Sequence, residues 1–189
     1  MSSKSENKKI EESELLMVDT KDHIIGCSTK ENCHKEPILH RAFSVFLYTG
    51  DKMLIQQRAI EKYHSGGLWT NACCSHPRVG QPIEEEVKTR LKEELGIICE
   101  CEKKFSFLYY HQFRNDLYEY EMDHVFIGEF NGEVIVNPSE VMDVKWIPFE
   151  ELREDVLKHP ERYTVWFITA LPRVLEQIEG INLNNRYRV

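Results

Sequence analysis

Residues 69–97 read WTNACCSHPRVGQPIEEEVKTRLKEELGI, and this stretch indicates both the fold and the chemistry of the chain. Its first half brings a thiol, an imidazole and a proline together in what we expect to be one short loop. Its second half predicts a helix, because Pro82 suits a first turn and Gly96 suits the residue after a last turn. A loop of nucleophile and ligand side chains that leads into a carboxylate-rich helix is typical of a metal-dependent phosphate site.

The predicted helix carries a carboxylate on its apolar side. Its apolar residues recur every four positions and form one stripe: Ile83, Val87, Leu91 and Leu95. At about 100° per residue, Glu94 falls inside this stripe and Arg90 lies at its edge. A buried carboxylate needs a partner, so Glu94 either forms an ion pair with Arg90 or binds a cation. We therefore treat Glu94 as a candidate metal ligand.

Length and composition predict one soluble domain. The chain has 189 residues, of which 41% are apolar and 30% charged, and its net charge of −8 argues against a nucleic-acid partner. No apolar run approaches the ~20 residues that cross a membrane, and the amino terminus has no secretory signal. We expect a cytoplasmic protein without a membrane partner, with six reduced cysteines. Residues 1–13 are expected to be a disordered tail and residues 14–189 a single domain.

The order of the expected elements predicts an α/β fold with a mixed sheet. A hairpin over residues 15–26 and a polar connector over 30–37 come first. The remaining elements are listed in chain order: strands 40–48 and 52–58, a loop over 61–67, the helix already described, strands 104–114, 117–130 and 141–147, a helix from Pro148 to Leu152 and a helix over 164–178. Strands on both sides of a central helix, followed by terminal helices, favour an α/β sandwich.

Histidines and carboxylates suggest a cation site. Three histidines stand in the connector, at a strand start and in the loop before the central helix: His34, His40 and His76. Glu119 and Glu121 lie two residues apart on a predicted strand and so share one face. They form either a solvent-facing row or a cation site, because neighbouring like charges repel unless a cation relieves them. Imidazoles with carboxylates suit manganese, zinc or iron, whereas oxygen ligands with phosphate suit magnesium.

Cys74 is a candidate nucleophile, because a charged or metal-bound His76 would lower the pKa of its thiol and make a thiolate usable. A closed zinc site of Cys73, Cys74 and His76 is the alternative, although adjacent cysteines fit one tetrahedral ion poorly. Arg58, Lys62 and Arg90 flank the site in sequence, with Lys30 further away, and favour a phosphorylated substrate. Trp166 is either a core anchor or an aromatic face for a cation.

Three segments together resemble the type 1 isopentenyl-diphosphate isomerases: HRAFSVFL (40–47), WTNACCSHP (69–77) and EELG (93–96). The resemblance runs from about Leu15 to beyond Trp166 and implies a Nudix-like α/β/α sandwich with a mixed central sheet. The Nudix box, laid over residues 75–97, has Ser75 in place of its first glycine, Gln81 in place of its first glutamate and Arg90 in place of a helix glutamate. These departures disfavour a Nudix-type diphosphate hydrolase, which is the alternative function. A metal-binding protein that only holds a prenyl diphosphate is the third hypothesis.

The resemblance implies an enzyme of isoprenoid biosynthesis that interconverts isopentenyl and dimethylallyl diphosphate. One proton is added to the double bond and another is removed, through a tertiary carbocation. The catalytic residues implied are the thiol of Cys74, the acid Glu121, Tyr109, which supports the carboxylate, and Trp166, which shields the cation. The metal ligands implied for a site holding Mn²⁺, Zn²⁺ or Mg²⁺ are His34, His40, His76, Glu119 and Glu121.

The resemblance also implies a Mg²⁺ ion that bridges the diphosphate, with Glu94 and the main-chain oxygen of Cys74 as ligands. The residues implied to bind the diphosphate are Lys30, Arg58, Lys62, Ser75 and Arg90. A flavin or NAD is not expected, since no Gly-rich dinucleotide motif is present. The expected partner is therefore a small-molecule prenyl diphosphate, and the enzyme is expected to be a monomer or a homodimer.

Overall fold

The strand β3 (His40–Thr49) is the centre of the fold, and most of its ten residues are buried. In the computed structural model, which describes residues 14–114 and 116–186 with side chains to residue 181, β3 runs through a nine-stranded sheet. It pairs in parallel with β8 (Tyr118–Glu129) and antiparallel with β1 (Glu14–Val18), β4 (Lys52–Arg58) and β6 (Cys73–Ser75). The sheet is therefore mixed, as the sequence predicted.

The remaining strands extend this sheet on both sides, and all their pairings are antiparallel. They are β2 (Ile24–Thr29) on β1, β7 (Glu102–Gln112) on β8, and both β5 (Trp69–Thr70) and β9 (Val141–Pro148) on β4. The predicted hairpins are confirmed, including the turn that joins β3 to β4. The expected tail over residues 1–13 and Asn115 of the turn between β7 and β8 lie outside the described residues.

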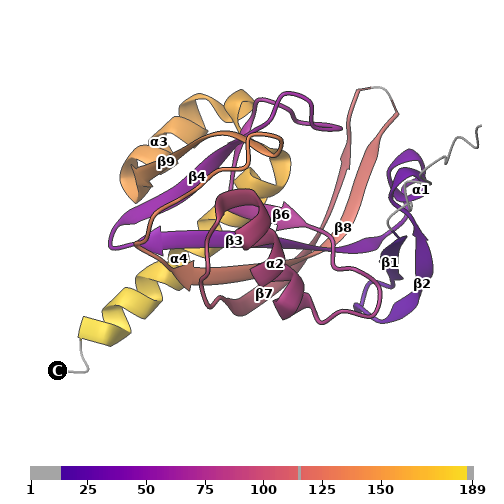
Figure 1. Ribbon diagram of the computed structural model, residues 1–189, viewed down its shortest axis with the longest axis horizontal. Coiled ribbons are helices and arrows are strands. Elements are labelled where there is room, and N and C mark those ends of the chain that lie inside the picture. Colours follow the sequence, from indigo (N-terminus) through magenta and orange to yellow (C-terminus); the bar gives the residue numbers. More distant parts are fainter. Residues whose placement is uncertain (1–13, 115, 187–189) are drawn as a thin grey trace, which may run out of the picture.

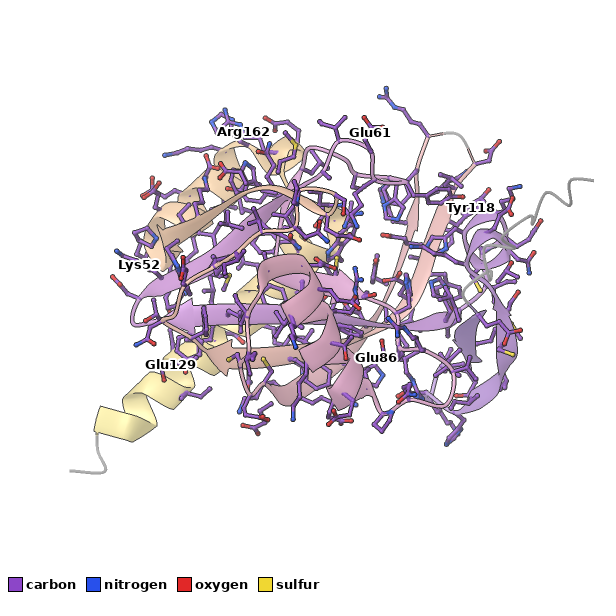
Figure 2. All side chains as sticks on the ribbon, viewed as in Figure 1. Lys52, Glu61, Glu86, Tyr118, Glu129 and Arg162 are labelled. Carbon is purple, nitrogen blue, oxygen red and sulfur yellow. The ribbon has the colours of Figure 1, made fainter. Side chains whose placement is uncertain are left out.

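Helices cover both faces of the sheet. The helix α2 (Ile83–Leu95) packs its apolar stripe against one face. The helices α3 (Phe149–Lys158) and α4 (Val165–Arg186) pack against the other. Figure 1 shows α2 in front of the sheet and α4 passing behind it. In Figure 2 the side chains of Lys52, Glu129 and Arg162 point outward at the edges of the molecule. This arrangement is the α/β/α sandwich that the sequence predicted.

The central helix has the boundaries that its sequence predicted. Pro82 precedes its first turn, and Gly96 ends it in the left-handed conformation with φ of 65°. The Gly96 N–H closes the last turn on the carbonyl groups of Leu91 and Lys92. Glycine adopts this conformation without the steric cost of a Cβ atom. Among the described helices, none is both long and apolar enough to cross a membrane.

Three predictions of local structure were wrong. The polar connector is partly the helix α1 (Lys30–Lys35), which begins after Thr29, where the Thr29 hydroxyl accepts a hydrogen bond from the Asn32 N–H at 3.2 Å. The expected loop before α2 contains β5 and β6, which are too short to show an alternating pattern. The last helix continues to Arg186, beyond its expected end at Ile178.

Candidate active site

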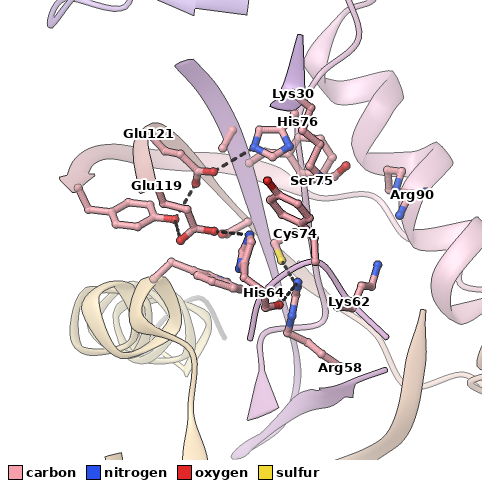
Figure 3. A pocket seen from close by; sticks show the side chains of 16 residues that line it. Lys30, Arg58, Lys62, His64, Cys74, Ser75, His76, Arg90, Glu119 and Glu121 are labelled. Atoms are coloured by element: carbon pink, nitrogen blue, oxygen red, sulfur yellow. Dashed lines mark hydrogen bonds and ion pairs between the residues drawn. The ribbon is translucent and has the colours of Figure 1, made fainter. Parts of the chain in front are cut away.

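A cleft of about 610 Å³ gathers side chains from α1, α2, α4, β3, β4, β6, β7, β8 and loop 61–67. Eleven residues singled out from the sequence line it: Lys30, Arg58, Lys62, Cys74, Ser75, His76, Arg90, Tyr109, Glu119, Glu121 and Trp166. Figure 3 shows the carboxylates of β8 on one side of this cleft and Arg58, Lys62 and Arg90 on the other. The cleft thus has an acidic end rich in histidine and a basic end.

Four side chains at the acidic end could hold a metal ion. The groups are those of His34, His40, His76 and Glu121, whose ligand atoms all lie within 4.8 Å of one another. The backbone fixes two of these rings, because His34 Nδ1 is 2.7 Å from the Lys30 carbonyl oxygen and His40 Nδ1 is 2.8 Å from that of Ile38. A ring whose Nδ1–H donates to a carbonyl leaves the lone pair of its Nε2 free for a metal.

The donor set fits a divalent ion. The Nε2 atoms of His34 and His40 are buried and have no hydrogen-bond partner among the described residues. Burial lowers the pKa of His34 and lowers that of His76 to about 3, so both rings are neutral, as a ligand must be. Unprotonated nitrogen atoms and a carboxylate oxygen are all acceptors and cannot hydrogen-bond to one another. A cation bound among them would give each of these buried atoms a partner.

Glu119 and Glu121 share one hydroxyl group. The Tyr109 hydroxyl lies 2.8 Å from Glu119 Oε2 and 2.7 Å from Glu121 Oε2, and all three side chains are buried. Because this hydroxyl has one proton to donate, it can donate to only one carboxylate, and the other must supply a proton of its own. Burial and the charge of Glu121 raise the pKa of Glu119 well above its usual range. Glu119 is therefore the protonated member of the pair when no cation is bound.

Glu121 is the charged member of this pair. Burial alone would raise its pKa, but the neighbouring rings of His40 and His76 outweigh that effect and hold it well below its usual range. His76 Nε2 lies 3.0 Å from Glu121 Oε1, and His40 Nε2 lies 3.5 Å from the same atom. The two glutamates share one face of β8, as predicted, while Met122 packs with Val18 and Leu39 on the other face. They are buried rather than a solvent-facing row.

The thiol of Cys74 is protonated near neutral pH. Loss of solvent around it raises its pKa to about 12, although the guanidinium group of Arg58, 3.6 Å from the sulfur, opposes the shift. A neutral His76 does not lower this pKa, and the thiolate expected for a charged or metal-bound His76 stays a prediction. Cys73 packs in the core beneath α2 whereas Cys74 faces the cleft, because successive strand residues point to opposite faces. The closed zinc site of Cys73, Cys74 and His76 is therefore contradicted.

The basic end of the cleft already contains carboxylate partners. Arg90 lies 2.6 Å from both Glu93 and Glu94, and the buried Glu94 also accepts a hydrogen bond from Gln56 Nε2 at 3.1 Å. Lys62 pairs with Glu140. The Arg90–Glu94 ion pair left open by the sequence is thus present. A cation that binds Glu94 would compete with this pair and free Arg90 for another anion.

Trp166 combines both roles considered from the sequence. It is only 3% exposed, and its indole N–H donates to Asn71 Oδ1 at 3.2 Å, so it anchors the start of α4. It also lines the cleft, and the Arg58 guanidinium carbon lies 5.2 Å from its ring centroid. The hydrogen bond to Asn71 fixes the edge of the indole, and the ring therefore presents a stable aromatic wall.

His64 is a cleft residue that the sequence did not single out. Its Nε2 lies 3.1 Å from Glu119 Oε1, and its side chain is only 11% exposed. His34, His64 and Glu119 form a second group whose ligand atoms lie within 4.8 Å of one another. Glu119 belongs to this second group rather than to the group of His34, His40, His76 and Glu121. The one local signal was a histidine two residues after Lys62, in a loop without periodicity.

Comparisons with known proteins identify the family. The NUDIX domain family matches residues 38–167. Isopentenyl-diphosphate Delta-isomerase 2 of Photorhabdus laumondii is 48% identical over 154 residues, which cover 81% of this chain and 87% of that protein. Isopentenyl-diphosphate Delta-isomerase 2 of Aromatoleum aromaticum is 43% identical over 165 residues, 87% of each chain. The chain belongs to the isopentenyl-diphosphate Delta-isomerase family.

Solved structures show the same fold as this isomerase-family chain. DR0079 from Deinococcus radiodurans has a TM-score of 0.70 at 17% identity and covers 85% of this chain and 98% of its own. The MutT protein from Methanosarcina mazei Go1 has a TM-score of 0.59 at 15% identity, covering 74% and 94%. The Nudix-like fold and the isomerase family that the sequence resembled are both confirmed.

Proposed function

We propose that this chain is an isomerase that interconverts isopentenyl diphosphate and dimethylallyl diphosphate. The observation that carries the proposal is that a thiol, Cys74, and a charged carboxylate, Glu121, line the same cleft as a cluster of basic side chains. The thiol and the carboxylate can exchange protons with a hydrocarbon, and the basic side chains can bind a diphosphate. The proposed reaction needs these two capacities in one cavity.

The proton balance requires one donor and one acceptor. In the forward direction a donor adds a proton to the terminal alkene carbon, and the positive charge develops on the tertiary carbon. An acceptor then removes a proton from the carbon on the other side of that centre, and the double bond forms there. Cys74 and Glu121 fill these two roles. In each turnover one of them loses a proton and the other gains one, and exchange with solvent restores both before the next turnover. The second step returns the substrate to its original charge.

The metal-binding residues would tune the acid. We propose that His34, His40, His76, Glu119 and Glu121 would hold a divalent ion (Mn²⁺, Zn²⁺ or Mg²⁺), and that Glu94 with the Cys74 carbonyl oxygen would hold a Mg²⁺ that neutralises charge on the diphosphate. Such an ion withdraws charge from a bound carboxylate and so strengthens its acid form. Tyr109 keeps the two glutamates oriented through its hydrogen bonds to both.

The rest of the cleft protects the cationic intermediate. Trp166 presents its π-face to the centre where positive charge develops, and an indole ring attracts a cation without reacting with it. Exclusion of water by the surrounding walls prevents capture of the cation as an alcohol. Lys30, Arg58, Lys62, Ser75 and Arg90 would bind the diphosphate, whose binding energy holds the hydrocarbon against the reacting groups.

We further propose that the enzyme is cytoplasmic, has no nucleic-acid or membrane partner, and acts as a monomer or a homodimer. Its six cysteines are free thiols, which supports a reducing compartment. Its net charge of −8 opposes binding to nucleic acid.

Product analysis tests the proposed reaction. The purified protein with Mg²⁺ and Mn²⁺ is incubated with isopentenyl diphosphate and followed by proton and phosphorus NMR. We expect dimethylallyl diphosphate with both phosphorus signals retained. Release of inorganic phosphate or of a monophosphate would instead identify the Nudix-type hydrolase. A protein that binds the substrate but forms neither product would contradict the isomerase and leave a binding protein.

A further inference from the structure

We propose that His64 is a positioning residue that orients the carboxylate of Glu119, and that loop 61–67 thereby links the basic end of the cleft to its acidic end. The expected effect on kcat rests on the proposed function, whereas the expected effect on metal affinity does not. His64 lies outside the three segments by which the chain resembles the family, 40–47, 69–77 and 93–96.

The contact itself is specific. Glu119 is held from two directions, because His64 Nε2 lies 3.1 Å from Oε1 and the Tyr109 hydroxyl lies 2.8 Å from Oε2. Figure 3 shows the contact between His64 and Glu119 as a dashed line. With each oxygen held by a different element, the carboxylate plane cannot turn freely. Hydrogen bonds of this kind to a ligating group set its orientation and the strength of metal binding.

Aromatic neighbours hold the imidazole ring in place. His64 stacks on Phe113 with the ring centroids 4.8 Å apart and an angle of 28° between the planes. It meets Trp166 edge-on at 6.0 Å. These contacts come from β7–β8 and from α4, so the ring is clamped between parts of the chain far apart in sequence. A clamped ring can orient its partner, whereas a solvated ring cannot.

The backbone of the same loop leads to the basic end. The Arg58 guanidinium group donates to the His64 carbonyl oxygen at 3.2 Å, and its other terminal nitrogen faces the Cys74 sulfur. Lys62 lies two residues before His64. Two of the proposed diphosphate-binding residues therefore hold, or belong to, the segment that carries His64. A diphosphate bound at the basic end would hold loop 61–67 in place through Arg58 and Lys62. The loop in turn would hold the carboxylate of Glu119 through His64.

Direct metal ligation by His64 is the competing explanation. His34 belongs to both groups that could hold an ion, but its one available lone pair, on Nε2, can bind only one ion. An ion held with His40, His76 and Glu121 therefore leaves His64 and Glu119 without the third ligand of their group. His64 then serves as a donor to Glu119, and a nitrogen that carries a proton for this bond has no lone pair for a metal.

Two amide substitutions separate the contact from the rest of the side chain. In His64→Gln the amide nitrogen reaches the position of the imidazole Nε2, whereas in His64→Asn it reaches only that of Nδ1. The readouts are the dissociation constant for Co²⁺, from its visible absorption spectrum, and kcat and KM with Mn²⁺. We expect His64→Asn to weaken Co²⁺ binding and to lower kcat by about 10- to 100-fold each, and His64→Gln to restore most of both.

His111→Asn is the matched control, because His111 also contacts Phe113, at 4.5 Å, and is not proposed to act in the site. In a Glu119→Gln background the effect of His64→Asn should disappear, since its route is through that carboxylate. Equal losses in His64→Gln and His64→Asn, with a changed Co²⁺ spectrum, would overturn the proposal in favour of direct ligation. Unchanged Co²⁺ affinity in His64→Asn would also overturn it. Failure of the isomerase proposal would leave the Co²⁺ result intact, so the two failures are distinguishable.

Discussion

Tyr109→Phe is the substitution that best tests how the two carboxylates are held. It removes one oxygen atom and keeps the ring, which stacks on Phe107 with centroids 5.7 Å apart. The lost hydroxyl lies 2.8 Å and 2.7 Å from Glu119 and Glu121. A hydrogen bond to a charged group contributes about 1.5–3 kcal/mol, and about 1.36 kcal/mol corresponds to a tenfold change in rate. We therefore expect kcat/KM to fall about 10- to 150-fold.

The matched control is Tyr110→Phe. Tyr110 is the next residue on β7, is 52% exposed, and packs against Tyr118 and Tyr120 on the opposite face. The same loss of a hydroxyl there should leave kcat/KM unchanged. Rates are measured by proton NMR with saturating Mn²⁺ and Mg²⁺, and circular dichroism verifies the fold of each variant. If Tyr109→Phe retains the wild-type kcat/KM, the hydroxyl bridge does not organise the carboxylates and the reasoning is refuted.

Three further predictions concern the thiol, the basic end and a buried acid. Cys74→Ala should lower kcat by about 10²- to 10⁴-fold, which is the usual contribution of a proton-transfer group. Calorimetry should find a substrate affinity close to that of the wild type. Wild-type turnover in this variant would show that the thiol does not transfer a proton. Lys62→Gln should raise KM more than it lowers kcat, since Lys62 would bind the diphosphate rather than the reacting carbons, and steady-state kinetics would contradict this if only kcat fell. Burial raises the pKa of Asp123 from 3.8 to about 8, so the folded protein retains a proton that the unfolded chain releases, and stability falls as pH rises through this window. The melting temperature of the metal-free protein, measured from pH 4 to 8, should therefore fall less steeply in Asp123→Asn than in the wild type. An unchanged slope would show that Asp123 does not cause the loss of stability.

The sequence predicted the parts of the site that depend on local periodicity. Glu94 lies within the stripe that α2 buries, and a period of 3.6 residues is enough to locate it there. Glu119 and Glu121 share a face because strand residues alternate. The fold class followed from the order of strands and helices together with the family resemblance. In these cases neighbours in sequence carry the information.

Other parts of the site depend on contacts between distant segments and had no local signal. The strand β6 consists of three residues and exists because Phe43, Ser44 and Val45 pair with it. Tyr109 lies beside its carboxylates because β7 pairs with β8 in a register that sets Tyr109 opposite Glu121. His64 reaches Glu119 through the path of an irregular loop, and no periodic pattern describes such a path. The family resemblance indicated that Tyr109 belongs to the site, but it gave no indication of His64.

Deuterium incorporation is the most direct test of proton transfer by Cys74 and Glu121. The hydrogens on a thiol and a carboxyl group exchange with solvent, so both groups carry deuterium when the enzyme is equilibrated in D₂O. Isopentenyl diphosphate converted in that solvent should give dimethylallyl diphosphate with one deuterium in the methyl group formed from the terminal alkene carbon, as mass spectrometry and NMR would show. A product with no deuterium in that methyl group would mean that hydrogen moves within the substrate. That result would contradict proton transfer through these two residues.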